Sequence, residues 1–362
     1  MKCVIFVNSL LGLITAVQIR EYIYRDCEFD IILSDMVSEL KNIFDNRILE
    51  EKFSNVKFIK YKNQKKIDKL LFYVSPKLYM KKLLGDSFQL YTDIFFWNPT
   101  LLFHSCIMYL DKKKHHYNLH LYGDALGSYV TDYPFDNEHF KFRILNRLLR
   151  LVNGFKYVKD LNYDYYVFAS EYISFRSKHR IIEIPTVKEE IVSYYNRLFN
   201  YHKKTKINNC IIFMDKQHDD QFKKDDHALK IIQEIIKVMG NEEVVVKPHP
   251  RQDIRIYSND NINILNMKIP WELYCFNNDI SDKVIISYGS TALFMPFIFN
   301  SKQKYTLINV KTKSKFEEIF ENEYGMFIKK FKLKNSNFYD LENIDQLIEI
   351  LDKIFDGRRI LK

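Results

Sequence analysis

The 362-residue chain has only five cysteines, and none of them lies in a CxxC pair or in a cluster with histidine. They are odd in number, far apart and mostly set in apolar runs: Cys3, Cys27, Cys106, Cys210 and Cys275. This pattern argues against a disulfide framework and against a zinc site. It predicts buried free thiols in a reducing compartment.

Several short motifs that mark familiar chemistries are also missing. The chain contains no Asp-x-Asp, no GxxxxGK[ST], no GxGxxG and no HExxH. These absences argue against a metal-dependent nucleotide-sugar site, a kinase or ATPase, a dehydrogenase of the common dinucleotide-binding type, and a zinc protease.

Long apolar runs are missing as well. No stretch of about 18 apolar residues occurs, so no membrane-spanning helix is expected. The N-terminus, MKCVIFVNSLLGLITAV, has a lysine before an apolar run, as a secretory signal does. However, Asn8 and Ser9 interrupt the run and no small-x-small cleavage pattern follows, so we expect a first strand and helix instead.

The composition is that of a globular protein with a positive charge. Hydrophobic residues make up 47% of the chain and charged residues 28%, and 362 residues are enough for two domains with their own cores. Fifty-five Lys and Arg against 46 Asp and Glu give a net charge of +9. The charge favours an anionic partner, meaning an acidic or phosphorylated substrate, nucleic acid or an anionic membrane; solvated basic loops are the alternative.

Strand-like apolar runs alternate with segments of helical periodicity along most of the chain. A first series extends from a strand at 2–7 and a helix at 10–24 to a helix at 187–198. A second extends from a strand at 210–214 to one at 305–309; it includes a strand at 262–265 and a helix at 291–299, and a last helix follows at 341–355. Such alternation predicts mostly parallel sheets with helices on both faces. We predict an N-terminal domain over 1–200, a polar linker over 201–207 and a C-terminal domain over 208–362.

Three loops directly follow predicted strands, where open α/β sheets bind their ligands. The first of them, at 247–251, contains two prolines that prevent the strand from continuing, so His249 lies where the strand meets the loop. His249 is a candidate phosphate partner or general acid, with Lys247 and Arg251 raising the local positive potential. The alternative is a histidine ordered by a turn, beside two solvated cations.

The second loop, at 288–291, runs from Tyr288 through Gly289 into a predicted helix. Ser290 and Thr291 would bind an anion there through their hydroxyls and free backbone N–H groups, and Gly289 would allow close approach. The alternative is a plain helix cap. Glu272, in the first turn of another predicted helix, either complements the helix dipole or accepts hydrogen bonds from a ribose.

The third loop, at 123–129, contains Asp124 between Gly123 and Ala125. A carboxylate in a glycine-containing loop at a ligand site suits a general base; the alternative is an aspartate that stabilises the turn. The loop at 215–226 is crowded with carboxylates, most of which we expect to be solvated. One of them could still reach the site.

Five segments in this order resemble a known family: Asn8-Ser9-Leu10-Leu11, Tyr122 to Tyr129, Lys247 to Arg251, Pro270-Trp271-Glu272 and Tyr288 to Leu293. The set resembles bacterial GT-B sialyltransferases, namely glycosyltransferase family 52 (the lipooligosaccharide sialyltransferases) and the related capsule polysialyltransferases. The resemblance covers residues 8 to 293. It implies a GT-B-like α/β fold of two doubly wound Rossmann-type domains that face each other across a cleft.

The resemblance also implies roles for individual residues. Asp124 matches the second acid of an Asp/Glu-Asp/Glu-Gly motif, His249 the histidine of the HP motif, and Ser290-Thr291 the motif that holds the phosphate of CMP. Gly123 and Ala125 depart from the acidic motif. In the lipooligosaccharide enzymes the base lies upstream of the HP motif, which would favour Asp219 or Asp220. The expected sites are therefore, for catalysis, Asp124, His249 and Asp220; for the donor, Lys247, Arg251, Glu272, Tyr288, Gly289, Ser290 and Thr291; and for the acceptor, Asn8, Ser9 and Gly127.

The function implied is inverting transfer of sialic acid from CMP-sialic acid to a hydroxyl of a lipooligosaccharide or capsular glycan, with no cofactor and no metal. The acceptor is expected to be lipid-linked, and the protein to be cytoplasmic with peripheral contact to the inner membrane; a homodimer is left open. Alternatives are a GT-B transferase that uses another CMP-nonulosonic acid, CMP-Kdo or a UDP-sugar, and a non-catalytic anion-binding module. Nucleic acid is not an expected partner, because no RNP-type or helix-turn-helix signature is present.

Overall fold

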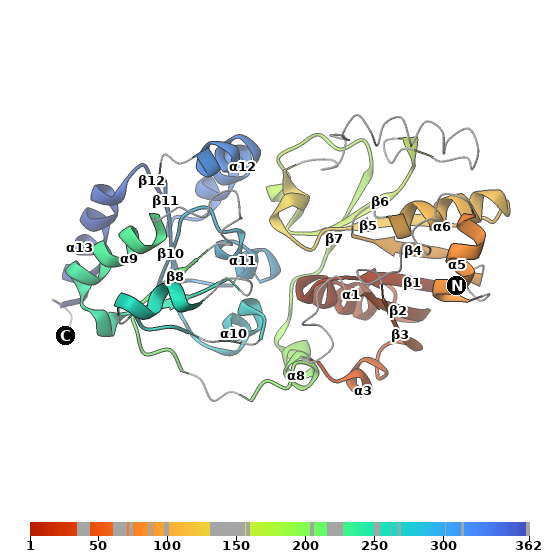
Figure 1. Cartoon of the computed structure of the whole chain (residues 1–362), viewed down its shortest axis with the longest axis horizontal. Coiled ribbons are helices and arrows are strands. Elements are labelled where there is room, and N and C mark those ends of the chain that lie inside the picture. The colour runs from red at the N-terminus through yellow and green to blue at the C-terminus, as the bar shows by residue number, and fades with distance from the viewer. Residues whose placement is uncertain are drawn as a thin grey trace. The chain divides into compact units, whose positions relative to one another are not determined.

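The structure is a computed structural model that describes residues 1–34, 44–60, 71, 75–85, 88, 90–97, 101–130, 156, 160–202, 206–215, 227–249, 254–260, 262–265, 267, 269–300, 302–312 and 315–359. The chain divides into two compact units, Met1–Tyr201 and His202–Lys362 (Figure 1). None of the described helices combines the length and the apolar character that crossing a membrane requires.

The N-terminal unit is built on a parallel sheet. Its strands are β1 (Lys2–Val7), β2 (Glu28–Ser34), β3 (Asn55–Ile59), β4 (Asp93–Phe96), β5 (Asn118–Tyr122), β6 (Asp164–Phe168) and β7 (Arg180–Ile184). They lie in the order β3-β2-β1-β4-β5-β6-β7, and every neighbouring pair is parallel. This is the doubly wound order in which the chain reverses direction across the sheet between β1 and β4. The carboxyl ends of strands at such a reversal form a ligand-binding crevice.

The helices among the described residues of this unit are α1 (Leu10–Tyr22), α3 (Asn46–Leu49), α5 (Pro76–Leu84), α6 (Leu101–Lys112) and α8 (Glu189–Leu198). The last of them, α8, packs back on the first. Gln18 donates to the hydroxyl of Tyr195 at 3.0 Å, and that hydroxyl donates to the carbonyl of Ile14 at 3.1 Å. Since α8 buries one face at helical spacing against this unit, the end of α8 belongs to the N-terminal core.

The C-terminal unit has a second parallel sheet. Its strands are β8 (Ile211–Met214), β9 (Val244–Lys247), β10 (Val284–Ser287), β11 (Thr306–Val310) and β12 (Phe338–Leu341), in the order β12-β11-β10-β8-β9. All neighbouring pairs are parallel. This order is the flavodoxin-like one, and its reversal point lies between β8 and β10.

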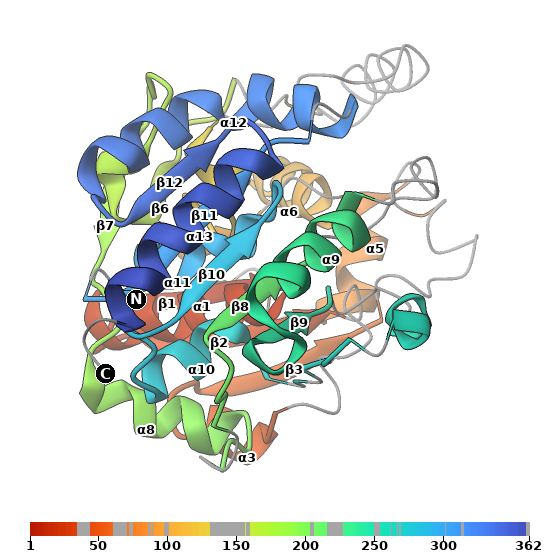
Figure 2. The ribbon, with the colours of Figure 1, turned by 90° about the vertical axis from the view of Figure 1, so that its left-hand side faces the viewer.

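Helices cover both faces of the second sheet. On one face lie α9 (His227–Met239) and α13 (Ile344–Arg359), in front of the strands in Figure 2, where they share a core with alternate residues of the sheet. On the other lie α10 (Trp271–Asn277), α11 (Met295–Phe299) and α12 (Lys315–Lys334). Phe331 of α12 packs edge-on against Phe294, Phe297 and Phe338.

Most predicted strands and helices are present, with four corrections. Leu341, predicted to begin the last helix, is the last residue of β12, because it pairs with Val310; the helix begins at Ile344. The segment 262–265 forms only an isolated bridge between Val246 and Ile264. The predicted helix at 291–299 is divided into a 3-10 turn, η8 (Thr291–Leu293), and α11, because Pro296 has no N–H and fits only a first helical turn. Both α12 and β12 were missing from the prediction.

Some predicted helices fall on residues that the structure does not describe. Helical periodicity also predicts helices at 36–46, 65–84 and 139–152, of which residues 36–43, 65–70, 72–74 and 139–152 lie outside the described residues. The cysteines are free thiols, as predicted, and three of the five are buried.

Candidate functional site

The carboxylate of Asp124 lies over the first turn of α1. Ser9, the N-cap of α1, accepts a hydrogen bond from the backbone N–H of Gly12 at 2.8 Å and donates its own hydroxyl hydrogen to Asp124 Oδ2 at 2.5 Å. The approach is close enough that a Cβ at residue 12 would lie 3.2 Å from that carboxylate oxygen. The carboxyl-side loops of β1 and β5 are thus joined through one serine and one aspartate.

Asp124 has a carboxyl group with a raised pKa. Burial raises the pKa of its carboxyl group, and this effect outweighs the hydrogen bonds from Ser9 and from its own backbone N–H, which lower the pKa. The residue as a whole is partly buried. A carboxylate whose pKa is raised towards neutrality is a more effective general base than a solvated one.

The departure at Gly123 from the acidic motif has a steric reason. A Cβ at residue 123 would lie 2.7 Å from Ser128 Cβ and 3.1 Å from Val167 Cγ1. Ser128 and Gly127 belong to a 3-10 turn, η2 (Leu126–Tyr129), which is held in place by the hydroxyl of Tyr165 on the Ser128 carbonyl at 2.8 Å. Position 123 therefore has no room for an acidic side chain.

The remaining acceptor-side candidate, Asn8, directly follows β1 and is partly buried. The structure therefore brings Ser9 and Asp124 together, whereas Gly127 helps to form the turn beside them.

In the C-terminal unit, one row of residues crosses the whole sheet at its carboxyl end. In the order of the strands, the paired residues are Lys247, Met214, Ser287, Asn309 and Asp340. Residues paired in this way in a parallel sheet point to the same face. Four of the five are polar, which is unusual for positions in a buried sheet, and the carboxyl end of such a sheet is where ligands commonly bind.

The loop after β10 is held by this row. The backbone N–H of Gly289 donates to Asn309 Oδ1 at 3.0 Å, and that of Ser290 donates to Ser287 Oγ at 3.2 Å. The prediction that the Ser290 amide would be free for an anion is therefore wrong, because the Ser287 hydroxyl accepts from it. The Ser290 side chain makes no capping hydrogen bond to η8, so its hydroxyl is the group to consider for a ligand.

Gly289 is needed for the shape of this loop. Its φ of 78° lies in the left-handed region that other residues avoid. The glycine thus serves the turn itself, in addition to allowing close approach.

Asp215, directly after β8, is a buried carboxylate at the reversal point of the sheet and is 4% exposed. It accepts hydrogen bonds from the hydroxyl groups of Tyr257 and Tyr288, the latter at 3.3 Å. Asp215 belongs to the carboxylate-rich loop at 215–226 but was not among the predicted site residues. The available signal was its position directly after a buried strand, the same signal that selected Lys247 and Tyr288.

Lys247 and Glu272 each influence the ionisation of the other. Glu272, in the first turn of α10, is 4% exposed, and burial raises its pKa to about 7 although Lys247 acts in the opposite direction. Burial lowers the pKa of Lys247, while Glu272 raises it. Glu272 lies in the first turn of α10, so the alternative that it complements the helix dipole stands, whereas Lys247 is only partly buried.

His249 lies two residues beyond β9 and is partly buried. Arg251 and Asp220 lie outside the described residues, as does Asp219. Among the residues that the structure describes, no group of three or more His, Cys, Asp and Glu side chains is arranged to hold a metal ion.

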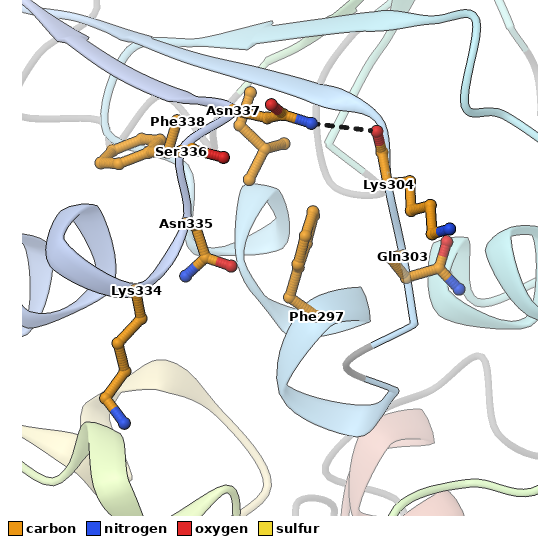
Figure 3. Close-up of a pocket in the computed structure, with 9 residues that line it drawn as sticks. Phe297, Gln303, Lys304, Lys334, Asn335, Ser336, Asn337 and Phe338 are labelled. Atoms are coloured by element: carbon orange, nitrogen blue, oxygen red, sulfur yellow. Dashed lines mark hydrogen bonds between the residues drawn. The ribbon is translucent and has the colours of Figure 1, made fainter.

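A cavity of about 160 Å³ lies elsewhere in the same unit, between the end of α12 and the starts of β11 and β12 (Figure 3). Lys304 and Lys334 line it together with Asn335, Ser336 and Asn337 over an apolar floor. The cavity lies at the amino end of the sheet, opposite the polar row. Lys334, in the last turn of α12, complements the negative end of the helix dipole, so its place there has a structural reason.

Comparisons with solved structures define the class of fold. A sialyltransferase from Photobacterium damselae, over residues 113–497 that correspond to its GT-B domain, matches with a TM-score of 0.52 and 14% identity, covering 94% of this chain and 100% of that chain. The glycosyltransferase of kitacinnamycin matches with a TM-score of 0.55 and 9% identity, covering 99% and 91%. A putative UDP-N-acetylglucosamine 2-epimerase from Listeria monocytogenes has a TM-score of 0.52 and 9% identity, covering 99% and 88%. The fold is that of GT-B glycosyltransferases, as predicted.

A family model identifies the group within that class. The model described as alpha-2,8-polysialyltransferase matches residues 4–309, and the chain belongs to this family. No curated protein sequence matches the chain significantly. The protein is thus a glycosyltransferase of a sialyltransferase family, in agreement with the resemblance seen in the sequence motifs.

Proposed function

We propose that the protein transfers sialic acid from CMP-sialic acid to a hydroxyl group of a cell-surface glycan, with inversion at the anomeric carbon and without a metal ion. Asp124 takes the proton of the acceptor hydroxyl. The acceptor oxygen attacks the anomeric carbon from the face opposite the leaving group, the bond from that carbon to the phosphate oxygen breaks, and CMP departs. Family membership supports the sialyl group as the unit transferred.

The observation that carries this proposal is the contact between Ser9 and Asp124. It places a carboxylate with a raised pKa at the carboxyl end of the first sheet. A base of this kind is what deprotonation of a sugar hydroxyl near neutral pH requires.

We assign the donor to the C-terminal unit. His249 and the hydroxyl groups of Ser290 and Thr291 are proposed to stabilise the phosphate of departing CMP, and Glu272 to accept hydrogen bonds from the ribose. The positions of Ser290 after β10 and of His249 after β9, at the carboxyl end of one sheet, support this assignment.

The family description also bears on the acceptor. An alpha-2,8 linkage joins the anomeric carbon of one sialic acid to the C8 oxygen of another, so we propose an acceptor that already ends in sialic acid, on a lipooligosaccharide or a capsular chain. A sialylated acceptor should support faster CMP release than the same glycan without its terminal sialic acid. Equal rates on the two would contradict this acceptor.

The central test measures CMP release from CMP-N-acetylneuraminic acid in the presence of a sialylated acceptor, with and without EDTA. Replacing a general base typically costs 10²- to 10⁴-fold, so Asp124→Asn should lower kcat by about that factor. Asp164→Asn is the matched control: this carboxylate lies at the amino end of the same sheet, paired with Arg180. Activity of the wild type should survive EDTA.

The outcomes separate the alternatives. Near-wild-type turnover by Asp124→Asn would remove Asp124 as the base and leave Asp219 and Asp220 as the candidates. Turnover of CMP-Kdo, of another CMP-nonulosonic acid or of a UDP-sugar in place of CMP-sialic acid would favour the corresponding transferase. Nucleotide binding without turnover of any donor would indicate a non-catalytic anion-binding module.

We further propose peripheral contact with an anionic membrane through the end of α12. Leu333 is 87% exposed there and is flanked by exposed Lys332 and Lys334, a combination that suits insertion beside anionic headgroups. The protein should sediment with vesicles that contain phosphatidylglycerol but not with pure phosphatidylcholine, and Leu333→Ser should weaken the binding. Equal sedimentation with both vesicle types would contradict the proposal.

A further inference from the structure

Asn309 joins the loop that carries Ser290 to the neighbouring strands. It is 3% exposed, and both ends of its side-chain amide are used. Oδ1 accepts from the backbone N–H of Gly289 at 3.0 Å, and Nδ2 donates to Asp340 Oδ1 at 2.9 Å. Three adjacent strands, β10, β11 and β12, are therefore linked at their carboxyl ends by two hydrogen bonds through one side chain.

Asp340 determines which way the amide of Asn309 faces. An ionised carboxylate can only accept hydrogen bonds, so it holds the NH₂ group towards β12 and turns the amide oxygen towards Gly289. Lys311 lies 3.8 Å from Asp340 Oδ2 and is itself held by Glu342 at 2.7 Å and by Glu321 at 3.2 Å.

The loop geometry depends on the Asn309 contact. Gly289 has a φ of 78°, and the next amide, that of Ser290, is bound by Ser287 Oγ, which in turn donates to the Met214 carbonyl at 2.8 Å. Two consecutive amides of the loop are thus each bound by a side chain of the polar row. The place of the Ser290 hydroxyl follows from these two contacts.

We propose that Asn309 and Asp340 are positioning residues for the donor: they hold the loop at 289–291 so that Ser290 and Thr291 meet the phosphate of the nucleotide. This inference rests on the proposed function of those two hydroxyl groups. Neither Asn309 nor Asp340 touches the donor in this scheme. Their effect is on donor affinity, with the base in the other unit unchanged.

The test exchanges the side chains of residues 309 and 340, so that the hydrogen-bond donor and the hydrogen-bond acceptor change places. Asn309→Asp places two carboxylates against each other and removes the NH₂ group, whereas the double variant Asn309→Asp with Asp340→Asn restores the pair in reverse. In the double variant, the carboxylate at 309 can accept from both the Gly289 N–H and the new amide at 340. Asp340→Asn by itself keeps an acceptor for Asn309 and should be mild.

Binding of CMP is measured by calorimetry, and the donor KM and kcat by CMP release. The loss of one or two hydrogen bonds should weaken CMP affinity about tenfold in Asn309→Asp, and the double variant should recover to within about threefold of the wild type. The donor KM should follow CMP affinity, while kcat at saturating donor stays within about threefold of the wild type.

Control variants separate this inference from the proposed function. Asn337→Asp makes the same chemical change at the amino end of the sheet and should leave CMP affinity unchanged. Ser290→Ala tests the proposed donor site itself. If Ser290→Ala weakens CMP binding and Asn309→Asp does not, only the positioning role fails; if Ser290→Ala changes nothing, or the wild type does not bind CMP, the donor site fails as well.

Two further outcomes concern the fold. Should Asn309→Asp not fold, Asn309→Ala removes both hydrogen bonds without adding a charge and is expected to weaken CMP binding severalfold, and unchanged affinity in it would overturn the inference. A double variant that melts like the wild type but does not regain CMP affinity would also overturn it.

Discussion

Replacing Ser9 with alanine tests the proposed base through a residue that is not itself the base. The Ser9 hydroxyl serves Asp124 and caps α1 at the same time, since it donates to Asp124 Oδ2 at 2.5 Å and accepts from Gly12 N at 2.8 Å. Ser9→Ala therefore has two separate effects, one on the pKa of the base and one on stability.

The magnitudes follow from the two contacts. The Ser9 hydrogen bond stabilises the carboxylate and lowers its pKa, so its loss raises the pKa of Asp124 further. A hydrogen bond to a charged group is worth about 1.5–3 kcal/mol, and 1.36 kcal/mol corresponds to one pKa unit, so the rise should be about one to two units. Loss of the N-cap should lower the free energy of unfolding by about 1 kcal/mol.

The assay is the pH dependence of kcat/KM, with thermal unfolding measured on the same variants. Asp124 must be ionised to accept a proton, so the acidic limb of the Ser9→Ala profile should move to higher pH by about one to two units. Ser75→Ala is the matched control, because Ser75 is the N-cap of α5 and touches no carboxylate of the site. It should lose some stability and keep the wild-type pH profile. Ser9→Thr keeps the hydroxyl and should shift the profile less.

An unshifted acidic limb in Ser9→Ala, with a lowered melting temperature, would refute the reasoning. It would show that Ser9 caps the helix but that the ionisation limiting the rate is not that of Asp124. An equal shift in Ser75→Ala would show that the profile reports stability.

Two further predictions concern stability. The pKa of Glu272 is about 7 in the folded protein, above its value of 4.5 in the unfolded chain, so this group removes stability as the pH rises from about 4.5 to 7. The melting temperature of Glu272→Gln minus that of the wild type should therefore increase as the pH rises from about 4.5 to 7. A difference that does not change with pH would contradict the burial argument. Gly123→Ala should be destabilised by the close approach to Ser128 Cβ, and adding Ser128→Gly should restore part of the loss. If Gly123→Ala melts like the wild type, the steric reason given for this glycine is wrong.

Much of the fold could be predicted from hydrophobic patterns. The strand at 2–7 and the helix after it were placed within two residues at each end, because the apolar run, Ser9 and the helical period that follows all indicate the same boundary. By contrast, α12 was missed. Its charged residues, scattered aromatic residues and Gly325 give a weak period, and the aromatic contacts that stabilise it come from α11, β12 and the loop before α11.

The site was predictable to the extent that it depends on strand ends. Asp124, Lys247 and Ser290 all follow buried apolar runs, and the structure places each at the carboxyl end of its sheet. The burial and hydrogen bonding of the site residues were not predictable. The burial of Glu272 and the hydrogen bond from the Ser290 amide both depend on residues that are brought together only in the fold.

The row of paired residues at the carboxyl end of the second sheet shows that the sequence does not reveal the register of the strands. Asn309 was visible in the sequence as the last residue of a predicted strand, in the same position as many residues that merely end a strand. Its importance comes from lying level with Ser287 on one side and Asp340 on the other. A shift of one residue would turn its side chain to the opposite face, against α9 and α13, and would remove both contacts. Pairing over sequence separations of 22 and 31 residues therefore makes an ordinary asparagine a candidate for positioning the donor, and the exchange of Asn309 and Asp340 tests that pairing directly.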